Sequence, residues 1–213
     1  MKIVSSTIEA YISRCSEPEP KHLKLLSEET RLRTSAPHMS VGHYQGRVLS
    51  LISKLVQPRH VLEIGTFTGY SALCLAEGIT HDGFLITIDI NENLQSISQK
   101  YFDNSDYAHQ IRPMYGNALK LISELPYHFN LVFIDADKRS YVQYFDLVVE
   151  KMLAGGVILT DNVLWSSKVL EAYDTDDKEA SYIRAYNEKL RKDPRVETIM
   201  LPIRDGLTLA RVK

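Results

Sequence analysis

The spacing of apolar residues changes character near Pro58. From residue 44 to residue 56 apolar side chains recur every three or four positions, which is the spacing of a helix with one buried face, and Pro58 ends the pattern. Two shorter helix-like stretches come before it, separated by the proline-rich residues 17–20. We therefore expect a helical N-terminal cap over residues 1–57.

After Pro58, short apolar runs alternate with longer amphipathic stretches. The predicted strands are residues 60–64, 84–90, 110–115, 130–134 and 157–160. The predicted helices between and after them are residues 70–78, 92–102, 118–124 and 141–153. Such an alternation is typical of a parallel sheet that is covered by helices on both faces.

The last two apolar runs, residues 196–201 and 207–212, lie on either side of the turn signal Arg204-Asp205-Gly206. They predict an antiparallel β-hairpin. The expected fold class is thus α/β, a Rossmann-like, doubly wound, mostly parallel seven-stranded sheet with a C-terminal antiparallel β-hairpin and a helical N-terminal extension. We expect one domain over residues 1–213, in which residues 58–213 form the α/β core.

Composition and charge narrow the class of protein. With 44% hydrophobic and 24% charged residues the chain is in the ordinary globular range, and its net charge of −2 argues against a protein that mainly coats nucleic acid. The two cysteines, Cys15 and Cys74, lack the spacing of a zinc site or disulfide framework. No signal-peptide core and no apolar run of roughly 18 residues is present, so we expect a cytoplasmic location and no membrane partner.

A glycine-containing loop follows the first predicted strand. A dinucleotide loop needs glycine at its first, third and sixth places, which here hold Gly65, Phe67 and Tyr70. A bulky Phe67 disfavours a pyrophosphate but not a nucleoside without phosphates, such as S-adenosylmethionine. Asp89 ends the second strand, where an acidic residue can bind ribose hydroxyls. A tight turn and a helix cap would explain the same residues without any ligand.

Oxygen-bearing side chains follow two later strands. Asp135 comes after the fourth strand, and Asp161 and Asn162 end the fifth. If these strands are neighbours, the three side chains converge, and hard oxygen ligands suit Mg²⁺, Ca²⁺ or Mn²⁺. The alternative is that the acids only cap helices. Lys138 argues against it, since a cation in the first turn of a helix opposes the helix dipole, and a lysine beside a metal is a candidate general base.

Six motifs follow one another along the chain. They are Glu63-Ile64-Gly65-x-x-Thr68-Gly69-Tyr70-Ser71, Ile88-Asp89-Ile90-Asn91, Asp135-Ala136-Asp137-Lys138, Gly155-Gly156-Val157-Ile158, Asp161-Asn162-x-Leu164-Trp165 and Asp205-Gly206-Leu207-Thr208-Leu209. In order and spacing they resemble the motifs of the cation-dependent O-methyltransferases, the caffeoyl-coenzyme A and catechol O-methyltransferase group with its bacterial relatives. The resemblance extends from about Met39 to Val212.

The resemblance implies a role for each matching residue. It implies a divalent metal held by Asp135, Asp161 and Asn162, with Lys138 as the catalytic lysine. The implied contacts to S-adenosylmethionine are Met39, Val41, Glu63, Gly65, Thr66, Ser71, Asp89, Ala118 and Asp135. Asp205 falls where plant members contact substrate, although an Asp-Gly hairpin turn explains it equally well. The family also implies a homodimer.

The identity of the methyl acceptor is not fixed by these residues. Plant members carry Asp-Glu after the Met39 region, where this chain has Gly42-His43-Tyr44-Gln45. We therefore expect a catechol-like aromatic molecule rather than caffeoyl-coenzyme A itself. A second hypothesis is a tRNA wobble 5-hydroxyuridine as acceptor, bound by basic residues at 21–33 and 184–195 that equally well form solvated helix faces. A third, from another class, is a nucleotide-binding module or oxidoreductase.

Overall fold

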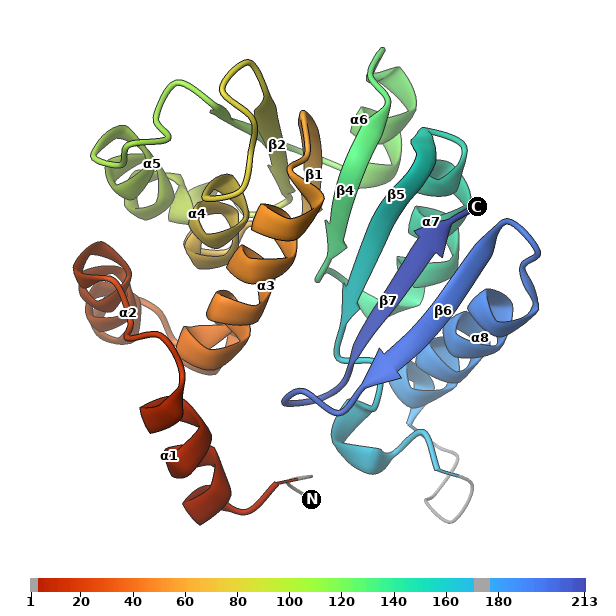
Figure 1. The fold of residues 1–213 in the computed structure, drawn as a ribbon, viewed down its shortest axis with the longest axis horizontal. Helices are drawn as coiled ribbons and strands as arrows, with labels where there is room; N and C mark the ends of the chain where they lie inside the picture. Colours follow the sequence, from red (N-terminus) through yellow and green to blue (C-terminus); the bar gives the residue numbers. More distant parts are fainter. Residues whose placement is uncertain (1–3, 171–176) are drawn as a thin grey trace. The chain divides into compact units, whose positions relative to one another are not determined.

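The structure is a computed structural model that describes residues 4–170 and 177–213. The chain forms two compact units, which comprise mainly residues 5–118 and residues 119–213 (Figure 1). In the described residues no helix has both the length and the apolar character needed to cross a membrane.

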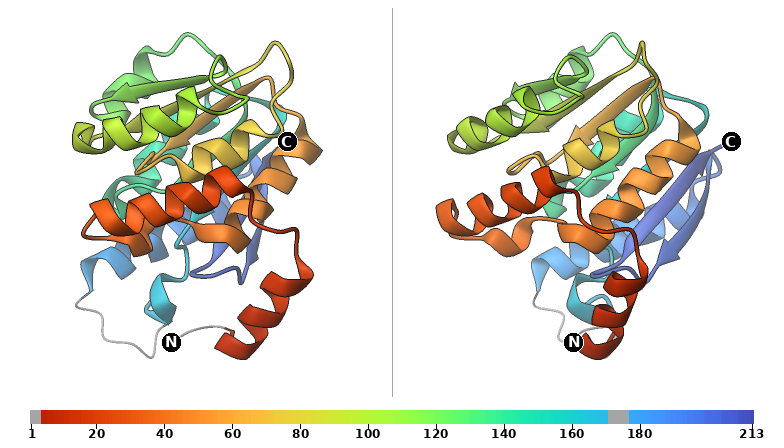
Figure 2. Two further views of the ribbon diagram at one scale, coloured as in Figure 1. Left: turned by 90° about the vertical axis from the view of Figure 1, so that its left-hand side faces the viewer. Right: turned by 60° about the vertical axis from the view of Figure 1, so that its left-hand side comes forward.

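The first unit begins with the predicted helical segment. Its elements are α1 (Ser6–Cys15), α2 (Lys21–Arg33), the 3₁₀ helix η1 (Pro37–Met39) and α3 (Gly42–Val56). The Ser5 hydroxyl accepts a hydrogen bond from the Ile8 backbone and so caps α1. Within this unit α3 packs on α4 (Tyr70–Ala76), and α2 lies beside both α4 and α5 (Gln95–Asp103), as Figure 2 shows.

Three parallel strands form the sheet of the first unit in the order β3-β2-β1. They are β1 (His60–Ile64), β2 (Phe84–Asp89) and β3 (Ile111–Tyr115), and the 3₁₀ helix η2 (Glu92–Leu94) leads into α5. The strands β1 and β2 are buried over nearly their whole length, which explains their continuous apolar sequence. Their parallel direction brings the ends at Ile64 and Asp89 to the same edge.

The second unit holds the remaining four strands in the order β4-β5-β7-β6. Here β4 is parallel to β5, whereas β7 is antiparallel to both β5 and β6. The elements are α6 (Ala118–Glu124), β4 (Phe129–Ile134), η3 (Lys138–Ser140), α7 (Tyr141–Val149), β5 (Met152–Asp161), η4 (Trp165–Ser167), α8 (Lys178–Lys192), β6 (Val196–Leu201) and β7 (Leu207–Val212). The helices α7 and α8 contact each other, α7 packs on β4 and α8 packs on β6 (Figure 1).

The predicted fold class is confirmed: the chain has a mostly parallel seven-stranded sheet, a C-terminal antiparallel hairpin with the predicted bounds, and helices before the first strand. The predicted helix over residues 141–153 is wrong at its end, because α7 stops at Val149 and β5 already begins at Met152. The first half of β5 contains exposed Leu153 and a register shift opposite β4, so it lacks the apolar run of a buried strand.

Candidate functional site

The glycine loop has the conformation that its glycines allow. Gly65 and Gly69 have φ of 103° and 93°, and Phe67 between them also has a positive φ of 48°. A Cβ atom at Gly69 would lie 2.6 Å from the Phe102 ring, so this position needs glycine for space as well as for conformation. The loop therefore turns sharply and packs closely against α5.

Asp89, the predicted ribose ligand, ties the end of β2 to this loop. Its carboxylate accepts hydrogen bonds from the backbone N–H of Phe67, at 2.7 Å, and of Asn91, at 2.8 Å. The side chain is half-buried. Asp89 thus shapes the turn, which agrees with the explanation that needs no ligand. It also lies at the strand end beside the loop, which is the position expected for a contact with a ribose.

Three buried polar side chains lie behind the loop. Glu63 on β1 and Thr87 on β2 are paired across the strands, and the Thr87 hydroxyl donates to the Glu63 carboxylate. Thr87 is also hydrogen-bonded to Thr66 of the loop. Because the Thr87 proton is directed to Glu63, Thr66 is the donor in this second bond. All three side chains are at most 2% exposed, so the chain of hydrogen bonds fixes the Glu63 carboxylate firmly. Thr87 was not predicted, although its place opposite Glu63 in a buried strand could have indicated it.

The other predicted cofactor residues of the first unit differ in exposure. Ser71 is buried in the first turn of α4, and Val41 is 3% exposed. Met39 ends η1 and is 57% exposed. Ala118 is the first residue of α6.

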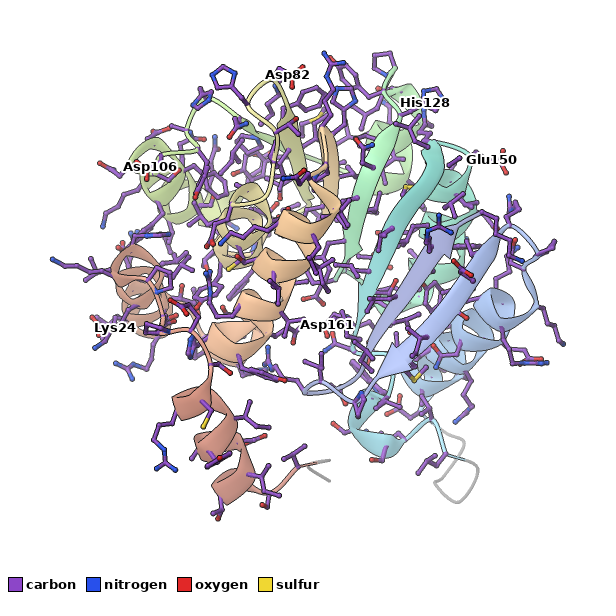
Figure 3. All side chains as sticks on the ribbon, in the orientation of Figure 1. Lys24, Asp82, Asp106, His128, Glu150 and Asp161 are labelled. Carbon is purple, nitrogen blue, oxygen red and sulfur yellow. The ribbon has the colours of Figure 1, made fainter. Side chains whose placement is uncertain are left out.

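The predicted metal ligands follow two neighbouring strands. Ile134 of β4 is paired with Thr160 of β5, so the next residues, Asp135 and Asp161, lie at the same level of the sheet. Asp135 follows the end of β4, whereas Asp161 is the last residue of β5 and is paired with Leu207 of β7. Asp161 is 3% exposed and marks the end of β5 in Figure 3. Asn162 adopts a left-handed conformation with φ of 58°, which bends the chain directly after Asp161.

Lys138 lies next to the acids, as predicted. Its ammonium group donates to Asp135 Oδ1 at 3.1 Å and to the Tyr141 hydroxyl at 2.6 Å, and its side chain is only 10% exposed. The expected α-helical first turn is instead the 3₁₀ helix η3, which leads into α7. The rings of Tyr141 and Trp165 have their centroids 4.8 and 6.0 Å from the lysine nitrogen.

Tyr141 connects the lysine to the second strand end. Its hydroxyl accepts from Lys138 and donates to the backbone carbonyl of Asp161 at 3.0 Å. Burial, together with the nearby charges of Asp135 and Asp161, raises the pKa of Tyr141 well above its usual value, so the phenol keeps its proton. No role was predicted for Tyr141, although its position three residues after Lys138 was an available signal.

Asp205, the predicted substrate contact, lies in the turn between β6 and β7. Its Oδ1 atom accepts a hydrogen bond from the backbone N–H of Ser166. Gly206 follows with φ of 89°, in agreement with the hairpin-turn explanation. The observed contact of Asp205 is therefore with the segment after β5.

Several basic residues on and after α8 are paired with acids. Arg191 and Lys192 both bind Glu188, and Arg195 binds Asp193, whereas Arg184 donates to the backbone carbonyl of Lys168. In the first unit Arg33 of α2 binds Glu29, while Lys24 of the same helix is exposed (Figure 3). These contacts agree with solvated helix faces.

The donor atoms after β4 and β5 fit a hard divalent cation. Two carboxylates and an amide oxygen are ligands that Mg²⁺, Ca²⁺ and Mn²⁺ accept, and three protein ligands leave further positions for water or a bound molecule. Lys138 already places one positive charge on Asp135. Across residues 4–170 and 177–213, no three His, Cys, Asp or Glu side chains form a group that could hold a metal; the proposed set contains two such residues, and Asn162 is the third member.

Comparisons with known proteins show the family of the chain. A family model described as O-methyltransferase matches residues 13–213. The chain is 34% identical to caffeoyl-CoA O-methyltransferase 2 of Petunia hybrida over 212 residues, covering 92% of this chain and 84% of the relative. It is 33% identical to caffeoyl-CoA O-methyltransferase of Petroselinum crispum, covering 91% and 84%.

Solved structures of similar fold hold the expected nucleoside. The O-methyltransferase from Bacillus cereus in complex with SAH superposes with a TM-score of 0.89 at 27% identity, covering 97% of both chains. The O-methyltransferase TomG from Streptomyces achromogenes, in complex with SAM, has a TM-score of 0.87 at 29% identity and covers 97% of this chain and 96% of its own.

Proposed function

The chain belongs to the O-methyltransferase family and is an S-adenosylmethionine-dependent O-methyltransferase; from this premise we propose that its acceptor is a catechol-like small molecule and that it works with a divalent cation. The observation that carries the proposal is the pairing of Ile134 with Thr160, which supports Asp135 and Asp161 at one level of the sheet edge, with Lys138 bound to Asp135.

The first unit would bind the methyl donor. Glu63 would accept hydrogen bonds from the methionine ammonium, and Asp89 from the ribose hydroxyls, while the backbone at Gly65 and the side chains of Thr66 and Ser71 would surround the methionine part. The fixed geometry of Glu63 supports this assignment, because a carboxylate that is already oriented loses little freedom when it binds a ligand. Met39, Val41 and Ala118 would complete the contacts.

The second unit would hold the acceptor. Asp135, Asp161 and Asn162 would bind the cation, and Asp135 would also face the donor, as the resemblance implies. When bound, a divalent cation would polarise hydroxyl oxygens and favour their ionised form. Two adjacent oxygens, as in a catechol, suit a cation with open coordination positions.

Lys138 would act as the general base, and for this step its side chain would first have released one ammonium proton to solvent. The neutral amine keeps two N–H bonds for Asp135 and Tyr141 and has a lone pair for the substrate. The acceptor oxygen attacks the methyl carbon, the carbon–sulfur bond breaks with its electrons moving to sulfur, and the hydroxyl proton passes to the lone pair of Lys138 Nζ. Tyr141 and Asp135 hold this nitrogen in place, so the protein's contribution is mainly the positioning of reacting groups.

The alternative functions receive less support. Arg191, Lys192 and Arg195 are paired with acids, which favours a solvated helix face over a tRNA-binding surface. Phe67 and Tyr70 stand where a dinucleotide loop needs glycine, which disfavours an oxidoreductase. The expected homodimer stays a prediction that light scattering would check.

The decisive experiment is an acceptor screen by mass spectrometry. Catechols, flavonoids, hydroxycinnamoyl thioesters and undermodified tRNA are incubated with S-adenosylmethionine and Mg²⁺, with and without chelator. We expect a methylated catechol product that disappears on chelation. We also expect Asp161→Ala to lose this activity while calorimetry with S-adenosylhomocysteine still detects binding. Full turnover in chelator would contradict the role of the metal, and methylation of tRNA alone would contradict the acceptor class.

A further inference from the structure

The segment after β5 contains a turn of unusual conformation. Trp165, Ser166 and Ser167 have φ of 45°, 51° and 69°, so three consecutive residues other than glycine occupy the left-handed region. Side chains with a Cβ atom adopt this region rarely, and such residues persist only where neighbouring contacts hold them. Contacts with neighbouring segments must therefore hold this turn.

The loop between β6 and β7 supplies these contacts. The backbone N–H groups of Val163 and Leu164 donate to the carbonyls of Gly206, at 3.3 Å, and Asp205, at 2.9 Å. The two segments approach so closely that a Cβ atom at Gly206 would lie 2.6 Å from Leu164 Cγ. The third bond reaches the strained residues themselves: the Ser166 N–H donates to Asp205 Oδ1 at 2.5 Å.

The same turn places the indole ring of Trp165. Its Nε1–H donates to Asp177 Oδ2 at 3.3 Å, and the same carboxylate oxygen accepts from Lys168 at 2.7 Å. Asp177 is itself fixed, because its other oxygen caps the N-terminus of α8. Held at its backbone and at its ring nitrogen, the indole lies with its centroid 6.0 Å from Lys138 Nζ.

We propose that Asp205 is a positioning residue: its carboxylate oxygen holds the left-handed turn at Trp165–Ser167 and thereby keeps the indole of Trp165 beside Lys138. The effect on catalysis rests on the proposed function of Lys138. In this role Asp205 acts through the turn, and the essential property of its side chain is a hydrogen-bond acceptor rather than a negative charge. If Asp205 only contacted the substrate, as the resemblance implies, removal of its hydrogen-bond acceptor would leave the turn at Trp165–Ser167 unchanged.

The intrinsic fluorescence of the protein reports on the surroundings of this indole, because Trp165 is the only tryptophan in the sequence. We compare the emission wavelength and acrylamide quenching of the full chain with those of Asp205→Ala, which removes the acceptor, and Asp205→Asn, which keeps it. Asp146→Ala is the control, since it removes a half-exposed acid that pairs with Lys189 elsewhere in the same unit.

We expect Asp205→Ala to shift the emission to longer wavelength and to raise the quenching constant at least twofold, whereas Asp205→Asn and Asp146→Ala stay near wild type. When Ser166→Gly is combined with Asp205→Ala, the fluorescence change caused by Asp205→Ala should be smaller by half or more, because glycine adopts the left-handed region without strain. In the methyl-transfer assay kcat should fall about tenfold for Asp205→Ala, with S-adenosylhomocysteine affinity changed less than twofold.

Unchanged fluorescence in Asp205→Ala would overturn the proposal, and so would an equal change in Asp205→Asn. If Asp205→Ala does not fold, Asp205→Gly, which also removes the acceptor and suits a turn, must show the fluorescence change expected for Asp205→Ala. A protein that never transfers methyl groups, yet shows the fluorescence changes, would refute the proposed function and leave the positioning of Trp165 standing.

Discussion

Lys138 and Tyr141 form a hydrogen bond of 2.6 Å between Nζ and Oη, and the same tyrosine hydroxyl donates to the carbonyl of Asp161 at 3.0 Å. One phenol therefore connects the lysine that follows β4 with the residue that ends β5. Because burial keeps the pKa of Tyr141 high, its proton stays on the hydroxyl and remains in the hydrogen bond to the Asp161 carbonyl. The tyrosine oxygen can therefore only accept from Lys138, and this contact fixes the direction of one N–H bond of the lysine.

Removal of this hydroxyl should misplace Lys138. A hydrogen bond to a charged group contributes about 1.5–3 kcal/mol, so we expect Tyr141→Phe to lower kcat roughly tenfold or more. Binding of S-adenosylhomocysteine should change less than twofold. Steady-state kinetics and calorimetry measure both. Tyr182→Phe, on α8 in the same unit, is the matched control and should keep wild-type turnover. Equal turnover in Tyr141→Phe and wild type would show that Lys138 needs no support from the tyrosine.

Thr87→Val should weaken binding of the methyl donor. Valine has nearly the same shape, but it removes the hydroxyl that lies between Glu63 and Thr66. A buried polar group that loses a partner costs about 1–3 kcal/mol, so we expect roughly tenfold weaker binding of S-adenosylhomocysteine and a lower free energy of unfolding. Thr87→Ser keeps the hydroxyl and should restore most of the affinity. Wild-type affinity in the valine variant would remove the Thr87 contact from the cofactor site.

Glu77 should make stability depend on pH in the acid range. Burial disfavours its charge, but hydrogen bonds from Arg47, Lys54 and Ser50 outweigh burial and lower the pKa of Glu77 to about 2, compared with 4.5 for a free side chain. A pKa that is lower in the folded state stabilises the fold above pH 4.5, and this contribution is lost as the pH falls from 4.5 toward 2.

We therefore expect Glu77→Gln to lower the free energy of unfolding by about 3 kcal/mol near pH 7, because Arg47 is left buried without its carboxylate. The difference from wild type should shrink as the pH is lowered below 4.5. Denaturation with urea at a series of pH values measures it. Asp82→Asn is the control, because it breaks an exposed ion pair with Arg59, and it should change the free energy of unfolding little at any pH. A pH-independent difference for Glu77→Gln would contradict the lowered pKa.

The sequence predicted the elements whose pattern reflects burial on one or both sides. The continuous apolar runs of β1 and β2 were found with nearly their true bounds, since a local pattern of burial determines them. The hairpin strands were found with their true bounds because a turn signal separates the two apolar runs. The start of β5 was taken for the end of a helix, because the pairing with β4 shifts from Met152 to Val157 and Leu153 between them is exposed. That pairing depends on a neighbouring strand and is therefore not visible in the local sequence pattern.

The same limit applies to the site. Asp135, Asp161 and Lys138 could be named as candidates because each follows a predicted strand closely. Tyr141 and Thr87 were missed: their positions in the sequence gave only a weak signal, since each makes a contact whose geometry becomes known only with the fold. Asp205 was linked by resemblance to the substrate, while its partner Ser166 lies 39 residues away and in a conformation that no sequence pattern announces.

Metal preference is the last prediction and follows from the donor set. Asp135, Asp161 and Asn162 offer oxygen atoms only, which suit Mg²⁺, Mn²⁺ and Ca²⁺ but lack the nitrogen or sulfur ligands that favour Zn²⁺. After chelation we expect Mg²⁺ or Mn²⁺ to restore turnover better than Zn²⁺. Titration followed by the electron paramagnetic resonance of free Mn²⁺ gives a readout that does not depend on activity. Asp161→Ala should weaken Mn²⁺ binding at least tenfold, because it removes one of two charged ligands, whereas the distant Asp146→Asn should leave it unchanged. Equal Mn²⁺ affinity in wild type and Asp161→Ala would place the cation elsewhere, and the acceptor would then need another means of activation.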